Sequence, residues 1–162
     1  MSKSNFQKVK DFNEVFGVPE HSVPQTNISK DNPDLTKLRL DLITEECKEF
    51  EEAVENHDFV EMVDALADIL YVVYGAGSSF GVDLDKAFDI VHESNMSKVC
   101  KSEEEAQATV QWYKDNSEVY DSPDYRKKGD FWVVYNKSTG KVLKSINYKK
   151  VKFDMNSLKI GA

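Results

Sequence analysis

The sequence has few of the residues that cross-link small proteins or bind soft metals, with two cysteines and three histidines among 162 residues. Cys47 and Cys100 show neither the CxxC spacing of zinc and redox sites nor a disulfide-rich setting. This pattern argues against a zinc centre and a disulfide scaffold. Cys47 falls on an apolar helix face, so we expect it to be a reduced, buried thiol.

The chain also lacks an excess of basic charge and a long apolar run. Its formal net charge is −8, with 29 acidic and 21 basic residues, which argues against a nucleic acid polymer as the main partner because phosphate backbones attract basic surfaces. The N-terminal segment has no apolar run typical of a signal peptide, and the apolar stretch 69–80 is too short to span a bilayer. We expect a cytoplasmic protein that does not contact a membrane.

The spacing of hydrophobic residues predicts a mainly α-helical protein. The expected helices cover residues 4–16, 34–56, 59–80, about 83–95 and 102–116. The short connection at 56–58 places the two long helices antiparallel and side by side. Asp34 is the predicted N-cap of the first long helix, Asp83 or Asp85 that of the shorter helix after residue 82, and Ser102 that of the last helix.

Two segments between or after the helices carry other signals. Residues 18–33 contain three prolines and are expected to form an extended loop. After a polar loop at 117–130, residues 131–135 and 141–146 read as a β-hairpin joined around 137–140.

Carboxylates occur in the two long helices at positions where apolar residues are expected. At about 100° per residue, Glu46 and Glu49 point into the apolar arc of the first long helix, and Glu45 lies at its edge. The second long helix is apolar nearly all round, except for a stripe formed by three acids, which are Glu61, Asp64 and Asp68. Buried carboxylates are costly without a partner, so the two stripes predict one shared site for a hard divalent cation such as magnesium.

Solvation or pairing with lysine and arginine is the alternative for these acids. Glu51, Glu52 and Glu55 point away from the apolar arc and are expected to form a solvated face. Arg39 lies on the same side of the helix as Glu46, nearly two turns earlier, and suits a salt bridge with it. Glu45 and Glu61 suit direct ligation and a supporting role equally.

Three runs of sequence, LRLDLITEECKEFEEA, DALADILYVVYGAGSSFGVDLDKAF and VHESNMSK, resemble the MazG-like all-α nucleoside triphosphate pyrophosphohydrolases, in a bacterial and phage branch. The likeness covers residues 4–100. The first family motif maps onto Glu45, Glu46 and Glu49. The second motif, Glu-x-x-Asp, places Asp68 at its aspartate, but Ala65 stands at the position of its glutamate. Asp64 lies one helical turn before Asp68 and could replace the missing glutamate. Alternatively, the motif is Glu61-x-x-Asp64.

The resemblance implies a fold and a division of the chain. Residues 1–100 would form the helical catalytic domain, an all-α NTP pyrophosphatase-type bundle. Residues 101–162 would form an extension with a helix and a small β-hairpin. The family also implies a homodimer or homotetramer in the cytoplasm of a bacterial or phage-infected cell.

The resemblance further implies metal-dependent hydrolysis of a (d)NTP, with dUTP or dCTP as candidates, to the monophosphate and pyrophosphate. Two or more Mg²⁺ or Mn²⁺ ions would be held by carboxylates, and Glu46 or Glu49 would act on the attacking water. The implied metal ligands are Glu45, Glu46, Glu49, Glu61, Asp64 and Asp68. The implied substrate contacts are Asn95, Lys98 and Arg39.

Two other functions remain open at this point. One is a catalytically silent helical oligomer that binds nucleotide or cation, which the substitution at Ala65 keeps possible. The other is a pyrophosphohydrolase that acts on phosphoribosyl-ATP or an alarmone.

The C-terminal aromatic residues and lysines also allow two interpretations. Trp112, Tyr113, Trp132 and Tyr135 either stack on a nucleobase or form a local core, which we favour. The lysines at 137, 141, 144, 149, 150 and 152 either attract a triphosphate or form a solvated edge that discourages strand pairing, which we favour.

Overall fold

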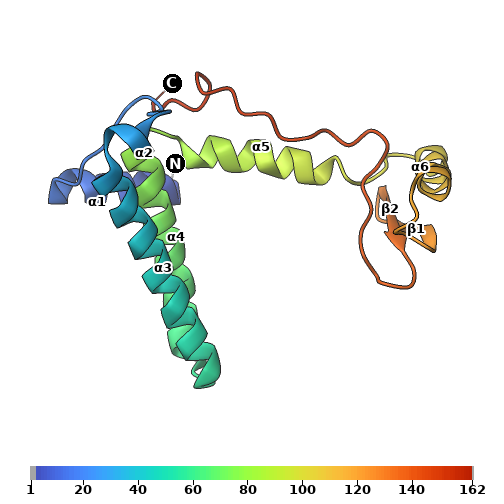
Figure 1. The fold of residues 1–162 in the computed structure, drawn as a ribbon, viewed down its shortest axis with the longest axis horizontal. Helices are drawn as coiled ribbons and strands as arrows, with labels where there is room; N and C mark the ends of the chain where they lie inside the picture. Colours follow the sequence, from blue (N-terminus) through green and yellow to red (C-terminus); the bar gives the residue numbers. More distant parts are fainter. Residues whose placement is uncertain (1–2, 162) are drawn as a thin grey trace. The chain divides into compact units, whose positions relative to one another are not determined.

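Helices make up most of the protein, as Figure 1 shows for a computed structural model that describes residues 3–161. This arrangement confirms the mainly α-helical class with a small C-terminal hairpin. In the described part of the chain the elements are α1 (Asn5–Phe16), α2 (Ile28–Asp31), α3 (Pro33–Glu55), α4 (Phe59–Phe80), α5 (Leu84–Met96), α6 (Glu103–Asn116), β1 (Pro123–Lys128) and β2 (Phe131–Asn136). Within residues 3–161, no helix is both long and apolar enough to cross a membrane.

Local capping explains most helix boundaries. The Ser102 side chain accepts a hydrogen bond from the Glu105 amide at the start of α6, and the Asp83 side chain accepts one from the Asp85 amide at the start of α5. The predicted cap Asp34 is wrong. Asn32 caps α3 instead by accepting from the Leu35 amide, because Pro33 takes the first helical position, where its missing N–H costs nothing.

The loop between α1 and α3 differs from its prediction because it contains the one-turn helix α2. The rest of this loop runs along the C-terminal end of α4. His21 and Gln25 donate backbone hydrogen bonds to the carbonyls of Ser78 and Phe80. Gly81 lies directly beneath the Val23 carbonyl.

The predicted hairpin is confirmed in part, because residues 141–143 lie antiparallel to β2 but the strand that pairs with β2 along its length is another one. β2 pairs with β1, which lies in the segment expected to be a polar loop, and the register places Lys128 opposite Phe131. Gly129 occupies the first central position of the two-residue turn at φ +58°, which suits a type II′ hairpin turn. Val142 forms an isolated antiparallel bridge with Tyr135. On either side of it, the Asn136 amide donates to the Lys141 carbonyl and the Leu143 amide donates to the Val134 carbonyl, both at 2.9 Å. β1 escaped prediction because its exposed half is an uninterrupted basic run without alternating apolar residues.

The described chain divides into two compact units. The first takes in the chain up to Phe88 and from Phe153 onward, and the second is Asp89–Lys152. The two units are distinguished by their compactness and not by their function. The assignment of a catalytic domain to residues 1–100 and of an extension to 101–162 stays a prediction.

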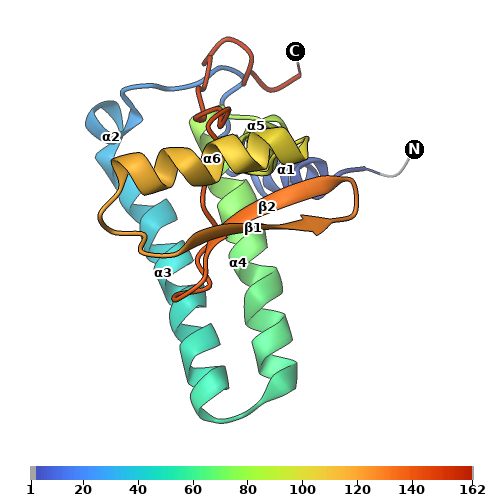
Figure 2. The same cartoon turned by 90° about the vertical axis from the view of Figure 1, so that its right-hand side faces the viewer.

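In the first unit, α3 and α4 lie side by side and antiparallel, as predicted, and α1 packs against α4 (Figure 2). Small side chains mark the α3–α4 contact, where Ala53 and Ala65 are only 5% and 3% exposed. Larger apolar side chains on both helices remain exposed, among them Leu38, Leu40, Val63, Leu66 and Leu70.

The expectation that Cys47 is buried is wrong, because Cys47 is exposed whereas Cys100 is buried. The apolar arc of α3 that carries Cys47 is not covered by other elements of the described chain, as the exposure of Leu40 shows. Helical periodicity correctly predicted which residues form the apolar face, but it did not predict whether another element covers that face.

In the second unit, α6 and the hairpin enclose a small core. Its buried members are Cys100, Ala106, Val110, Val134 and Leu143, with Tyr113, Tyr120, Tyr125 and Trp132 packed against it. The preferred core interpretation therefore holds for Tyr113 and Trp132, whereas Trp112 remains half exposed. Side-chain hydrogen bonds stabilise the turn after β2, because Asp121 accepts hydrogen bonds from Ser122, Ser138 and Asn136.

Gly81 and Gly17 provide a matched test of the contact between the loop and α4. Both end a helix in the left-handed region, at φ +76° and +65°, so alanine at either site should cost about 1 kcal/mol. A Cβ at Gly81 would also lie 2.0 Å from the Val23 carbonyl oxygen, whereas nothing lies within 4 Å at Gly17. We expect urea unfolding to show a clearly larger loss for Gly81→Ala, and equal losses would contradict the contact.

Asp121 should make the second unit sensitive to acid. Hydrogen bonds from Ser138, Asn136 and Ser122 lower the pKa of Asp121 from 3.8 to about 2. The carboxylate therefore stabilises the fold fully above pH 3.8, and this stabilisation is lost as the pH falls towards about 2. Asp121→Ala should lower the melting temperature at pH 7, and the difference from the parent should shrink at pH 2.

Glu118→Ala is the control for this prediction, because it removes one exposed negative charge from the same loop. It should leave the melting temperature nearly unchanged at both pH values. A loss for Asp121→Ala that does not depend on pH would mean that the carboxylate charge is unimportant.

Candidate active site

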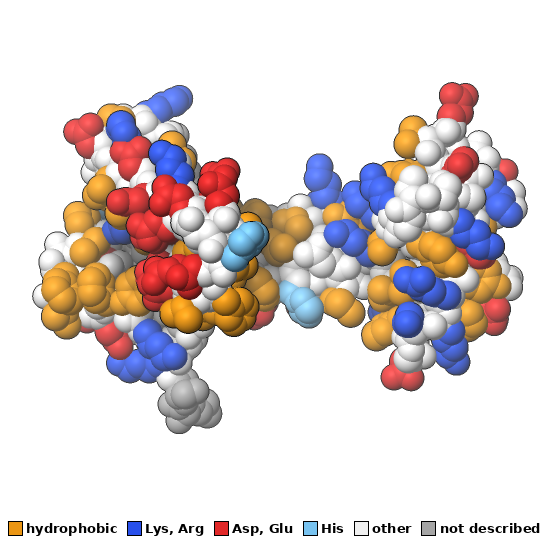
Figure 3. Space-filling model, turned by 90° about the horizontal axis from the view of Figure 1, so that it is seen from below, with side chains coloured by type: hydrophobic (Ala, Val, Ile, Leu, Met, Phe, Trp, Pro, Cys, Tyr) orange, Lys and Arg blue, Asp and Glu red, His pale blue; other side chains and the backbone are white. Residues whose placement is uncertain are grey.

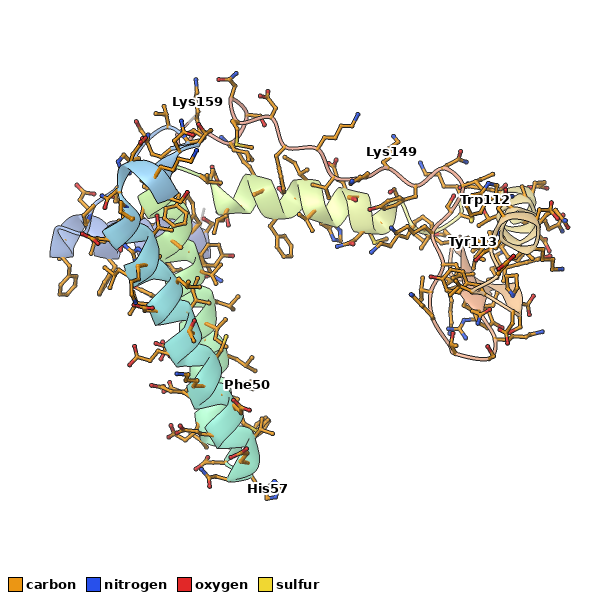
Figure 4. All side chains as sticks on the ribbon, in the orientation of Figure 1. Phe50, His57, Trp112, Tyr113, Lys149 and Lys159 are labelled. Atoms are coloured by element: carbon orange, nitrogen blue, oxygen red, sulfur yellow. The ribbon has the colours of Figure 1, made fainter. Side chains whose placement is uncertain are left out.

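The α3–α4 pair brings the two predicted acidic stripes to the same level. The connection between the helices centres on His57, which Figure 4 shows at the tip of the pair. In an antiparallel pair with this centre, positions 46 and 68 are equally far from the tip, as are positions 49 and 65. Glu46 and Glu49 on α3 are therefore level with the α4 segment that carries Asp64 and Asp68.

The electrostatics of Glu46 confirm that these carboxylates are neighbours. Burial raises the pKa of Glu46, and the negative charges of Glu49, Asp68, Glu45 and Asp64 raise it further, in that order. Five acids from two helices thus share one region of negative potential. Such a region attracts a cation because every added positive charge relieves this repulsion.

Glu61 does not contribute to the shift at Glu46 and lies closer to the tip of the pair. It lines a surface depression of about 460 Å³ together with Glu49, Glu52, Ala53, Asn56 and Asp58. A second depression, of about 490 Å³, is lined by Asp41, Thr44, Glu45, Lys48, Glu49 and Glu52. Glu49 belongs to both depressions.

The six acids are more exposed than the sequence predicted. Glu46 is partly buried, but Glu45, Glu49, Glu61, Asp64 and Asp68 are exposed. The physical reason is that the apolar arc around them is itself uncovered in the single chain. Figure 3 shows acidic and hydrophobic side chains gathered next to one another on the surface of the first unit.

The donor chemistry suits a hard divalent cation, although the ligands are not gathered around one point. Among residues 3–161, no three acidic, histidine or cysteine side chains converge closely enough to hold a metal ion. None of the six acids forms a salt bridge with a described lysine or arginine. The carboxylates are therefore free of cationic partners, and all of them are oxygen ligands of the kind that magnesium and manganese prefer.

Arg39 lies away from these acids. Its side chain is only 7% exposed, and its Nη2 donates a hydrogen bond of 2.6 Å to Ser79 Oγ near the C-terminal end of α4. Burial lowers the pKa of Arg39, and its Nε lacks a hydrogen-bond partner. Arg39 forms no ion pair with Glu46 in the described chain, so the salt-bridge alternative is wrong, while contact with substrate stays a prediction.

Sequence reasoning missed the polar cluster around Arg39. Ser79 also donates to the Pro19 carbonyl, His21 Nδ1 lies 2.6 Å from the Ser79 carbonyl, and Ser78 donates to Glu20. The run of small residues from Gly75 to Ser79 was the available signal, since a Cβ at Gly75 would lie 3.1 Å from Arg39 Nη1.

The structure brings Asn95 and Lys98 together. Both belong to the second unit, and Lys98 Nζ donates a hydrogen bond of 2.7 Å to Asn95 Oδ1. An ammonium and an amide side by side form a donor pair suited to phosphate oxygens. The predicted binding of phosphate by these two residues stays a prediction.

Comparison with known proteins places this geometry in a family. Residues 9–95, more than half of the chain, match the family described as phosphoribosyl-ATP pyrophosphohydrolase (PRA-PH). The chain belongs to the PRA-PH family. This confirms the resemblance to MazG-like NTP pyrophosphohydrolases and supports a pyrophosphohydrolase that acts on nucleotide-like substrates.

A viral protein is similar to this chain over nearly its whole length. The chain is 30% identical to an uncharacterized protein of Acanthamoeba polyphaga mimivirus, and the alignment covers 93% of this chain and 94% of the relative. The PRA-PH match ends at residue 95, so this similarity extends the comparison into the second unit.

Ala65 marks a local difference from the PRA-PH motif as read from the sequence. Its side chain is buried at the contact between α3 and α4. A carboxylate at this position would have to lie in the closest part of the helix pair, whereas Asp64 and Asp68 occupy open positions on either side. The role of Asp64 as a metal ligand in place of a glutamate at position 65 stays a prediction.

Proposed function

We propose that this PRA-PH protein hydrolyses a nucleoside triphosphate between the α- and β-phosphates and releases the monophosphate and pyrophosphate. The observation that carries the proposal is that Glu46 and Glu49 on α3 lie level with Asp64 and Asp68 on α4 and form no salt bridge with a described lysine or arginine. Burial and the charges of these neighbours raise the pKa of Glu46. A protein accepts such repulsion where a bound cation offsets it. The substrates we favour are dUTP and dCTP.

Glu46, Glu49, Asp64 and Asp68 would hold two or three Mg²⁺ or Mn²⁺ ions, with Glu45 and Glu61 nearby. Bound ions of this kind neutralise a triphosphate and lower the pKa of an attacking water. Either Glu46 or Glu49 orients that water and accepts its proton. For Asn95 and Lys98, which belong to the second unit, we propose contact with phosphate oxygens of a nucleotide.

Phosphoribosyl-ATP is a second candidate substrate, because the matching family carries that substrate in its description. It also contains an α–β phosphoanhydride, so the same carboxylates would serve both reactions. The experiment that separates the candidates is incubation of the full chain with each NTP, each dNTP and phosphoribosyl-ATP, with Mg²⁺ or Mn²⁺. Monophosphate plus pyrophosphate from an NTP or dNTP would support the proposal, and no product from any substrate would favour a catalytically silent oligomer.

Replacement of Glu49 by glutamine tests the carboxylate site. Glu49 is exposed, so Glu49→Gln should fold normally, but it removes one ligand charge or the proton acceptor. We expect turnover to fall by about 10²–10⁴-fold in the pyrophosphate-release assay. Glu51→Gln, an equal change on the exposed face that points away from the acids, should retain activity, and near-normal turnover of Glu49→Gln would reject the assignment.

We infer that the protein works as a homodimer or homotetramer. Large apolar side chains on α3 and α4 are exposed at many positions, among them Leu38, Leu40, Phe59, Val60, Val63, Leu66, Leu70 and Tyr71. Exposed apolar surface in this quantity favours a partner that covers it. A second copy of the chain would cover this surface and enclose the carboxylates beside it.

Leu66→Asp tests the association. Leu66 is 48% exposed, so an aspartate is tolerated in the free chain, but it would place an unpaired charge in the interface. Sedimentation at micromolar concentration should show a wild-type species heavier than the 18.5 kDa chain and a lighter Leu66→Asp variant. Val119→Asp, at an exposed apolar residue of the second unit, should sediment as the wild type, and a wild-type species of 18.5 kDa would refute the association.

A further inference from the structure

The two compact units differ sharply in charge. The second unit has twelve basic and ten acidic residues, a net charge of +2, whereas the rest of the chain carries −10. Residues 141–152 contain five lysines and no acidic residue. This segment is therefore the strongest candidate in the chain for contact with an anion.

The lysine-rich segment is hydrogen-bonded to the segment that carries Asn95 and Lys98. The Ser145 amide donates to the Lys98 carbonyl at 3.0 Å, and the Lys149 amide donates to Ser97 Oγ at 2.9 Å. Ser94 Oγ donates to the Lys149 carbonyl at 2.8 Å. These bonds hold together two segments about fifty residues apart in the sequence, so the lysines of both segments are neighbours.

Lys144 has a fixed backbone and a side chain without an acidic partner. The Tyr113 hydroxyl donates to the Lys144 carbonyl and accepts from its amide, both at 3.1 Å. Lys144 Nζ lies 4.6 Å from the centre of the Tyr148 ring, and it forms no salt bridge with a described acid. The ammonium is therefore held in place and available to an anion.

The positive charges act together on the Tyr148 hydroxyl. A hydrogen bond with Ser94 lowers the pKa of Tyr148, and the charges of Lys144, Lys98 and Lys150 lower it further. Lys144 and Lys98 therefore act on the same point, although they belong to different segments.

A cavity of about 420 Å³ adjoins Lys144 and has an aromatic wall. It is lined by Trp112, Tyr113, Lys144, Ser145, Ile146 and Tyr148. Trp112 is 49% exposed, although its neighbour Tyr113 packs against the core. Figure 4 shows Trp112 and Tyr113 on α6 and Lys149 on the segment that follows the hairpin. An exposed tryptophan in the same cavity as Lys144 matches a ligand that is aromatic at one end and anionic at the other.

We propose that the second unit has a nucleotide-binding subsite in which the nucleobase stacks on Trp112 and the phosphate oxygens are bound by Lys144 and Lys98. Aromatic stacking and lysine contacts are the interactions that proteins use for single nucleotides. The inference rests on the proposed function for the choice of a nucleotide as the ligand. It names a residue that would recognise the base, and it gives a function to the part of the chain after residue 95, where the PRA-PH match ends.

Binding without metal separates this subsite from the carboxylates. The full chain is titrated by calorimetry in EDTA with ATP, dUTP, uridine and inorganic tripolyphosphate. We expect the nucleotides to bind at least about tenfold more tightly than uridine or tripolyphosphate, because only they offer both base and phosphates. If tripolyphosphate bound as tightly as the nucleotides, the base would contribute nothing to affinity, and this result would overturn the proposal.

Two variants and a matched control assign the residues. Lys144→Met should weaken metal-free dUTP binding about tenfold, and Trp112→Leu about ten- to hundredfold. Lys141→Met removes the same charge from the same segment, at a lysine that also lies over a tyrosine ring, at 5.2 Å from Tyr120. It should bind dUTP as the wild type does, and equal losses for Lys141→Met and Lys144→Met would overturn the proposal.

Fluorescence gives a readout that misfolding of Trp112→Leu cannot imitate. In Trp132→Phe, the remaining tryptophan is Trp112, and dUTP should quench its emission whereas tripolyphosphate should not. Glu49→Gln distinguishes this inference from the proposed function, since it should lose turnover but retain metal-free dUTP binding. Quenching without any turnover by the wild type would reject only the proposed function, and normal turnover without quenching would reject only the subsite.

Discussion

The close contact between α3 and α4 is the constraint on which the first unit depends. Ala53 and Ala65 are buried where the two helices meet, and such small side chains let helix backbones approach closely. This approach also brings carboxylates of both helices near Glu46, where burial and like charge raise its pKa. The larger apolar side chains are consequently left on the outer faces. The same packing thus produces the acidic region and the uncovered apolar surface beside it.

Charge is distributed between the compact units in a way that suits nucleotide chemistry. The first unit carries the acids that attract cations, and the second carries unpaired lysines next to exposed aromatic surface. Carboxylates that hold divalent cations and lysines that contact phosphate directly are two separate ways to bind a nucleotide, and each unit on its own has one of them. Arg39 belongs to neither group, since its guanidinium is buried against Ser79.

Local signals explain why most of the fold was predictable. Helical periodicity and side-chain caps act over three to four residues, so α1, α4 and α6 have nearly the bounds expected from the sequence. The sequence did not predict β1 because this strand is half basic and exposed, and its pairing with β2 depends on a two-residue turn at Gly129. That Glu46, Asp64 and Asp68 lie at the same level of the helix pair followed from helix spacing and a short connection, both of which are local.

The sequence by itself determined which residues share a helix face, which helices are antiparallel neighbours and which acids lie together. Only the tertiary structure decided what covers each face. It left Cys47 and Glu49 exposed, buried Arg39 beneath α4 and joined the segment of Lys98 to that of Lys144. The physical reason is that periodicity within one helix reports its own chemistry, whereas burial and partner choice depend on elements that are distant in the sequence.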